Sequence, residues 1–88
     1  MNDFELEEGL KKKLKRILKK DPQFYEAILS KISQIVSTAD INHFKNLKAP
    51  LQYYKRVHIG SYVLLFQNKG NKILFSNLEH HDNIYKTL

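Results

Sequence analysis

The stretch LQYYKRVHIGSYVLLFQNKGNKILFSNL, residues 51–78, decides the fold. Apolar and polar side chains alternate along much of it, and a period of two is typical of half-buried β-strands. Two glycine-containing breaks interrupt it, at Gly60-Ser61 and at NKGN, and glycine suits tight hairpin turns. The stretch therefore predicts three successive antiparallel strands, at 51–59, 62–67 and 72–78.

The alternation also assigns faces to the first of these strands. Tyr53, Val57 and Ile59 lie on one face, which we expect to join the core. Arg56 and His58 lie on the other face, which is expected to be polar. This strand therefore predicts a basic surface on one side of the sheet.

The chain before these strands has a helical period. Apolar side chains recur at intervals of three and four residues over 7–19, which predicts an amphipathic helix. Asp21-Pro22 ends it and starts another, because aspartate caps a helix N-terminus and proline is tolerated in the first turn. The second helix is predicted to end at about Thr38, so the two helices form a hairpin.

The N-terminal sequence DFELEE alternates as well and predicts one more short strand. The predicted order is strand, helix, helix, strand, strand, strand. We expect an α+β fold in which the helical hairpin packs on one face of a small antiparallel sheet and the other face stays partly open. With 88 residues, of which 42% are apolar, the chain fits a single domain over 1–88.

The charge of the chain is strongly asymmetric. All 15 lysines and arginines, but only five of the nine acidic residues, lie in residues 9–88. Such an excess favours a polyanionic partner, with nucleic acid or an acidic protein as the candidates. The sequence has no cysteine, which excludes disulfides and cysteine-based metal or nucleophile sites. The longest apolar run, residues 62–66, is too short to span a membrane, and we expect a cytoplasmic protein.

The stretch FKNLKAPLQYYKRVHIGSYVLLFQNKGNKILFSNLEHHDNIYK, residues 44–86, resembles the C-terminal half of the RelE/ParE toxin superfamily, especially its archaeal and RelE-like members. The family pattern is Leu-Lys, a gap, Tyr-Arg-x-Arg-x-Gly-x-Tyr-Arg, a hairpin, and His-Arg-x-x-Ile-Tyr. The resemblance implies the toxin of a type II toxin-antitoxin system: a ribosome-dependent mRNA endonuclease that uses no metal or other cofactor. It also implies an acidic, RelB-like antitoxin as partner in a hetero-oligomer.

The resemblance also implies site residues. Lys48 matches the lysine of Leu-Lys, and counting back from Gly60 places Arg56 and His58 on the two arginine positions. Counting forward from the tyrosines places Lys55 on the first arginine position instead. The implied catalytic residues are Arg56, His58, His81 and Tyr85.

Two departures from the pattern concern charge. Val63 and His81 stand where the family usually has arginine. Cleavage by 2′-OH attack needs a proton acceptor, a proton donor and cations at the phosphate, and histidine can fill either proton-transfer role. His81 therefore either converts the site to histidine-based proton transfer or marks a toxin that has lost activity. If a helical turn begins at His81, Tyr85 shares its face.

The remaining cations are candidates for RNA phosphate contacts, although exposed lysines on a helix are most often only solubilising. The predicted RNA-binding residues are Lys48, Lys55, Lys12, Lys15, Arg16 and Lys19. His80-His81 is, on its own, most simply a solvated pair. No H-x-x-x-H or HExxH spacing occurs, so no metal site is predicted.

Two other functions stay open. The loss of arginine at Val63 and at the terminal position, where His81 stands, favours a binding-only member of the superfamily, either a ParE-like gyrase inhibitor or a catalytically decayed RelE fold. A basic RNA-binding domain with no toxin role is the third hypothesis.

Overall fold

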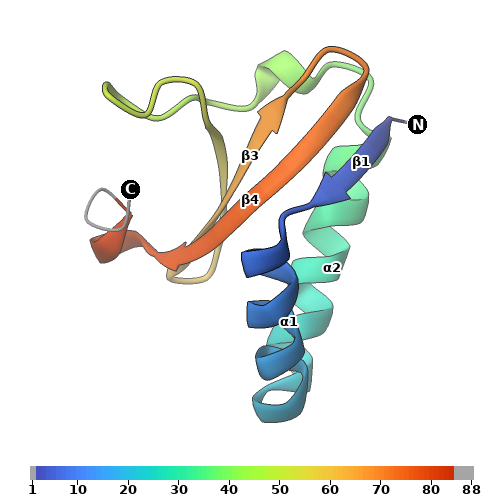
Figure 1. Cartoon of the computed structure of the whole chain (residues 1–88), viewed down its shortest axis with the longest axis vertical. Coiled ribbons are helices and arrows are strands. Elements are labelled where there is room, and N and C mark those ends of the chain that lie inside the picture. Colours follow the sequence, from blue (N-terminus) through green and yellow to red (C-terminus); the bar gives the residue numbers. More distant parts are fainter. Residues whose placement is uncertain (1, 85–88) are drawn as a thin grey trace.

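The computed structural model of the chain describes residues 2–84 and has the predicted order of elements (Figure 1). The short 3₁₀ turns lie on either side of the last three strands. The elements are β1 (Asp3–Leu6), α1 (Glu8–Lys20), α2 (Pro22–Ser37), a 3₁₀ turn (Ile41–His43), β2 (Lys55–Ile59), β3 (Tyr62–Asn68), β4 (Lys72–His80) and a second 3₁₀ turn (His81–Asn83).

The four strands form one sheet in the order β1-β4-β3-β2. The pairs β2–β3 and β3–β4 are antiparallel, as predicted. β1 runs parallel to β4, which the period of a single strand does not predict, so the sheet is mixed. A parallel pair needs a long connection between its two strands, and here the helical hairpin and two further strands provide it.

The helical hairpin covers one face of the sheet. The side chain of Asp21 accepts a hydrogen bond from Phe24 N at 3.1 Å and so caps α2, with Pro22 in its first turn. The largest buried side chains between the helices and the sheet are Leu10, Ile28, Ile35, Leu64, Phe66, Ile73, Phe75 and Leu78. The predicted packing of the hairpin is confirmed.

The opposite face of the sheet carries a second, smaller cluster. Leu47, Leu51 and Ile84 pack there against Val63 and Leu65. Leu64 and Leu65 are both fully buried although they are neighbours in β3, because successive side chains point to opposite faces. The open part of this face is therefore smaller than the sequence suggested.

β2 begins four residues later than predicted. Residues 51–54 form turns instead: Leu51 N donates to Lys48 O at 2.9 Å, and Tyr54 N donates to Leu51 O at 3.0 Å. These local bonds use backbone groups that a strand would present to a neighbour. Tyr53 consequently lies outside the sheet with 73% of its surface exposed, and its prediction as a core residue was wrong.

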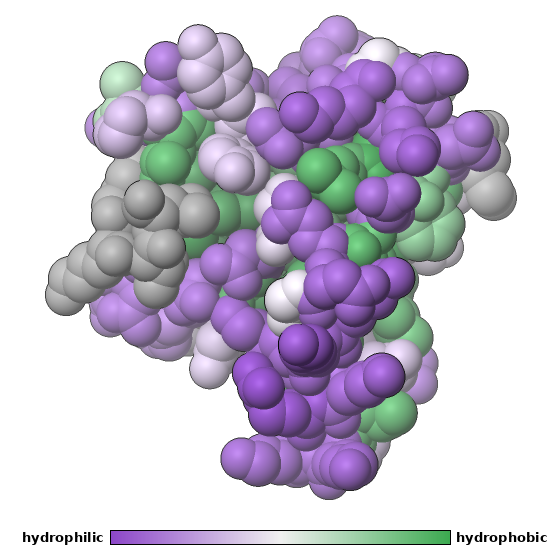
Figure 2. Space-filling model, in the orientation of Figure 1, coloured by the Kyte–Doolittle hydropathy of each residue, from purple (hydrophilic) through white to green (hydrophobic). Residues whose placement is uncertain are grey.

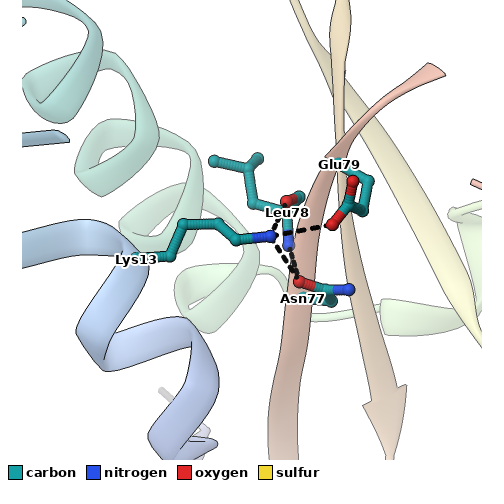
Figure 3. A network of polar contacts seen from close by, with 4 residues as sticks. All are labelled: Lys13, Asn77, Leu78 and Glu79. Carbon is teal, nitrogen blue, oxygen red and sulfur yellow. Dashed lines mark hydrogen bonds and ion pairs between the residues drawn. The ribbon is translucent and has the colours of Figure 1, made fainter. Parts of the chain in front are cut away.

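The outer edge of β4 is protected in two ways. β1 pairs with residues 72–75 only. Beyond that point Lys13 reaches the edge from α1: its Nζ donates to Leu78 O at 2.8 Å, to Glu79 Oε1 at 2.9 Å and to Asn77 Oδ1 at 3.1 Å (Figure 3). A charged side chain on an open edge discourages pairing with another chain. Within the described part of the chain, no helix is long and apolar enough to cross a membrane.

Candidate functional site

A hollow of about 340 Å³ lies on the sheet face that the helices do not cover. β2, β3, the segment before β2 and the second 3₁₀ turn all contribute to its wall. The lining residues are Asn46, Leu47, Lys48, Arg56, His58, Val63, His81 and Ile84.

β2 supplies two of the polar groups. Arg56 pairs with Leu65 and His58 pairs with Val63 across the β2–β3 ladder, so both side chains point to the face away from the helices. Val57 and Ile59, between and after them, join the core on the helix side. The prediction that Arg56 and His58 share a face is confirmed.

The turn after β4 supplies the third group. The backbone N–H of His81 donates to Ser61 O at 3.0 Å, which fixes the start of this turn beside the β2–β3 connection. Nδ1 of His81 lies 2.9 Å from Asp82 Oδ1. A carboxylate beside one ring nitrogen sets the orientation of an imidazole and leaves the other nitrogen for a ligand. About half of the His81 side chain is exposed.

His80 lies beside His81 but outside the hollow. Its ring stacks on that of His81 with 4.6 Å between centroids, but it does not line the hollow. Its Nδ1 accepts from Asp82 N at 3.2 Å, which caps the turn. His80, His81 and Asp82 bring one donor atom each within 4.8 Å of one another. Three ligands are fewer than the four of a structural zinc site and equal to the number that a catalytic zinc site takes from the protein.

The structure separates the other predicted residues. Lys48 lines the hollow with Arg56. Lys55 does not: it is 8% exposed, and its Nζ donates to Asn46 Oδ1 at 3.0 Å and to Phe44 O at 3.3 Å. This placement favours the alignment that puts Arg56, rather than Lys55, at the first arginine position. Tyr85 lies outside the described residues.

The predicted cations of the first helix lie on the other side of the sheet. Lys12, Lys15, Arg16 and Lys19 are exposed on α1, which packs on the main core and not on the hollow. Figure 2 shows hydrophilic side chains gathered over this helix. The two predicted groups of basic residues therefore face different sides of the molecule.

Sequence reasoning missed Asn46 and Ile84 as lining residues. The Asn46 amide donates to Gln52 O at 2.7 Å and accepts from Lys55, so it links the turn segment to β2. The sequence feature that could have indicated Asn46 as a lining residue is its position directly before Leu47-Lys48. Ile84 packs on Val63 and closes the floor of the hollow.

No protein-family model matches the chain. A protein of Methanocaldococcus jannaschii assigned as toxin RelE4 is 43% identical over 89 residues, which cover 98% of this chain and 93% of that protein. This chain belongs to the RelE toxin family. The identification rests on a relative that matches from end to end, so it confirms the resemblance drawn from residues 44–86.

Solved structures agree with the fold of this RelE-family chain. One is the RelB–RelE antitoxin–toxin complex from Methanococcus jannaschii, with a TM-score of 0.69 and 21% identity over 94% of this chain and 96% of that one. Another is the DinJ–YafQ complex of E. coli, with a TM-score of 0.63 and 15% identity over 97% and 99%. The RelE-like architecture predicted from the sequence is confirmed.

The hollow of the RelE-family chain combines two kinds of chemistry. Arg56 and Lys48 are cationic side chains, which suit a phosphate group. His58 and His81 are imidazoles, which can accept or donate a proton. Val63, 3% exposed, adds an apolar floor where the family pattern has a further cation.

Proposed function

We propose that this RelE-family toxin is a ribosome-dependent mRNA endonuclease that works without a metal and inhibits translation. One observation carries the proposal: Arg56 and His58 on β2 and His81 after β4 line the same hollow as Lys48. The family pattern assigns all four of these positions to its site. Cations and imidazoles around one hollow are what phosphodiester cleavage by 2′-OH attack needs.

In the proposed reaction the 2′ oxygen attacks phosphorus, the bond to the 5′ oxygen breaks, and the products are a 2′,3′-cyclic phosphate and a 5′ hydroxyl. His81 accepts the 2′ proton, since Asp82 beside Nδ1 leaves Nε2 as the accepting atom. His58 donates a proton to the leaving 5′ oxygen, and Arg56 with Lys48 stabilises the charge on the phosphorane. Tyr85 stays in the proposed set on the family pattern alone.

The proposed partners follow from charge. Lys12, Lys15, Arg16 and Lys19 on α1 would contact ribosomal RNA phosphates, because all four are exposed. An acidic, RelB-like antitoxin would bind the basic surface as it folds and form a toxin-antitoxin hetero-oligomer. Support comes from the related structures, which are complexes of a RelE with RelB and of YafQ with DinJ.

Primer extension on mRNA from a translating extract tests the activity. We expect the purified chain to cut translated mRNA and to leave the same RNA intact when ribosomes are absent. His81→Gln should slow cleavage at least about 100-fold, because proton transfer by a positioned side chain contributes that much or more. His43→Gln is the matched control, since His43 lies in the 3₁₀ turn before β2 and does not line the hollow.

The proposal fails if no ribosome-dependent cuts form, or if His81→Gln and Arg56→Gln cut like the unaltered chain. A second function is then favoured by Val63, whose apolar side chain replaces a cation in the hollow. A catalytically decayed toxin or a ParE-like inhibitor of DNA gyrase would have such a site. A supercoiling assay with purified gyrase separates these two, because only the ParE-like protein inhibits the enzyme.

A further inference from the structure

A second hollow, of about 430 Å³, lies on the helix side of the sheet. It forms where the end of α1 and the start of α2 meet β3 and β4. Three cations, Lys13, Arg16 and Lys20, line it together with the rings of Phe24 and Tyr62. The function proposed above uses none of these rings.

Two of the three cations are available to a ligand. The hollow also contains two carboxylates: Glu79 is paired with Lys13 at 2.9 Å, whereas Asp21 accepts a backbone hydrogen bond at the start of α2 and keeps its negative charge. No hydrogen bond or ion pair to another described residue occupies the side chains of Arg16 and Lys20. An anion in this hollow would therefore meet two unpaired cations.

A continuous series of ring contacts leads from this hollow to the candidate site. Phe24 lies 5.1 Å from Tyr62, Tyr62 lies 5.6 Å from His80, and His80 stacks on His81 at 4.6 Å. We call these four rings the ring series. Tyr62 is 39% exposed, which is high for a large side chain that packs against two rings. The ring series crosses from the helix side of the sheet to the hollow that His81 lines.

An exposed ring next to unpaired cations, as Tyr62 is here, is a common means of holding single-stranded nucleic acid. Bases stack on the aromatic faces, and the cations contact the phosphates between them. The carboxylates of an acidic peptide could meet Arg16 and Lys20 equally well, but these acidic side chains have no ring to stack on Tyr62. The combination therefore favours RNA over an acidic segment as the occupant.

We propose that single-stranded RNA bound in the candidate site continues along the ring series, with a base stacked on Tyr62 and the adjoining phosphates held by Lys20 and Arg16. In this proposal Arg16 contacts the bound strand, and Lys12, Lys15 and Lys19 remain for ribosomal RNA. The inference rests on the proposed RNA substrate and extends it to a second binding subsite. That subsite links the basic helix to the cleavage site around the end of the sheet.

Fluorescence anisotropy with a labelled single-stranded RNA of twelve nucleotides tests the subsite. The RNA is 2′-O-methylated throughout, so that binding is measured without cleavage. Tyr62→Leu should weaken binding about five-fold or more, since loss of one base-aromatic stack costs at least that much, whereas Tyr62→Phe should keep it. The slope of log association constant against log salt concentration is negative. In the double variant Arg16→Gln, Lys20→Gln its magnitude should decrease by about 1.4, because two phosphate contacts are lost.

Lys69→Gln is the charge control, because Lys69 is exposed in the β3–β4 turn at the opposite end of β3 from Tyr62. Circular dichroism confirms that each variant is folded. The inference is overturned if Tyr62→Leu binds like the unaltered chain, if Lys69→Gln lowers the salt slope as much as one subsite cation does, or if polyglutamate of equal charge displaces the RNA as well as unlabelled RNA does.

The outcome is independent of the cleavage experiment. A chain that binds the methylated RNA through Tyr62 but never cuts mRNA supports the subsite and contradicts the proposed nuclease. A chain that cuts mRNA and binds equally well without the Tyr62 ring supports the nuclease and contradicts the subsite. Absence of any binding to the methylated RNA also contradicts the subsite.

Discussion

Ser76 shows at the scale of one residue how a small irregularity is built into the sheet. The β3–β4 register passes from Leu65 opposite Asn77 to Phe66 opposite Phe75, so Ser76 is the extra residue of a bulge. Its hydroxyl is buried and has no hydrogen-bond partner among residues 2–84. A buried polar group without a partner lowers stability.

Ser76→Ala is therefore expected to stabilise the fold. Removing the unpaired hydroxyl should raise the free energy of unfolding by about 1 kcal/mol, as measured by urea denaturation. Ser61→Ala, at an exposed turn position, is the control and should stay within about 0.5 kcal/mol. A loss of stability in Ser76→Ala would mean that the hydroxyl has a partner in solution.

At the scale of elements, Lys13 joins α1 to the part of β4 that β1 leaves uncovered. Its Nζ makes three contacts there, and 28% of the side chain is exposed. The Glu79 side chain is 18% exposed, so its charge is partly withdrawn from water and depends on this partner. The link is therefore worth more than an ion pair on an open surface.

Lys13→Met should lower the free energy of unfolding by about 1–3 kcal/mol, because a partly buried carboxylate and a strand carbonyl lose their donor. Urea denaturation measures the change. Lys12→Met, one residue earlier on the exposed side of α1, should change stability by no more than about 0.5 kcal/mol. Equal effects of the two variants would contradict a specific role for Lys13.

The sequence predicted where helices and strands form better than it predicted which strands pair. Local period and capping residues determine where a helix or strand forms, and Asp21-Pro22 did so at the start of α2. Pairing between distant strands leaves no local pattern, so the parallel alignment of β1 with β4 was not predictable. Tyr53 was misplaced because apolar residues can alternate through a turn as they do along a strand.

The candidate site divides in the same way. The family pattern supplied Arg56, His58 and His81, and the structure brings them to one hollow. The family pattern could not predict that Lys55 is buried, because its burial depends on contacts with Asn46 and Phe44 in the segment before β2. Contacts between two segments cannot be predicted from the residue pattern of either segment alone.

At the scale of the whole molecule, the sheet is covered on both faces, although the two covers are unequal. The helical hairpin forms the large one, and the segment around Leu47 and Leu51 forms the small one. Between them, Leu64 and Leu65 are each 0% exposed and point in opposite directions.

Leu64→Ala and Leu65→Ala should therefore both be costly. Each variant should lower the free energy of unfolding by about 2–5 kcal/mol, the usual range for leucine truncated in a packed core. Thermal and urea denaturation measure both. If Leu65→Ala cost less than about 1 kcal/mol while Leu64→Ala stayed within that range, the second cover would not be a packed core in solution.

The order of the sheet also sets the width of the candidate site. Arg56 lies on β2 and His81 follows β4, with β3 between those strands. Neighbouring strands are spaced by about 4.8 Å, so two such steps, roughly 10 Å, separate the backbone of β2, which carries Arg56, from that of β4, after which the turn with His81 begins. The backbone hydrogen bonds that β3 makes to both neighbours fix this distance. Replacing a side chain of β3, such as Val63 by arginine, changes the groups between β2 and β4 but not the distance between their backbones. A substitution at Val63 would therefore change the chemistry of the hollow without changing the spacing of the strands around it.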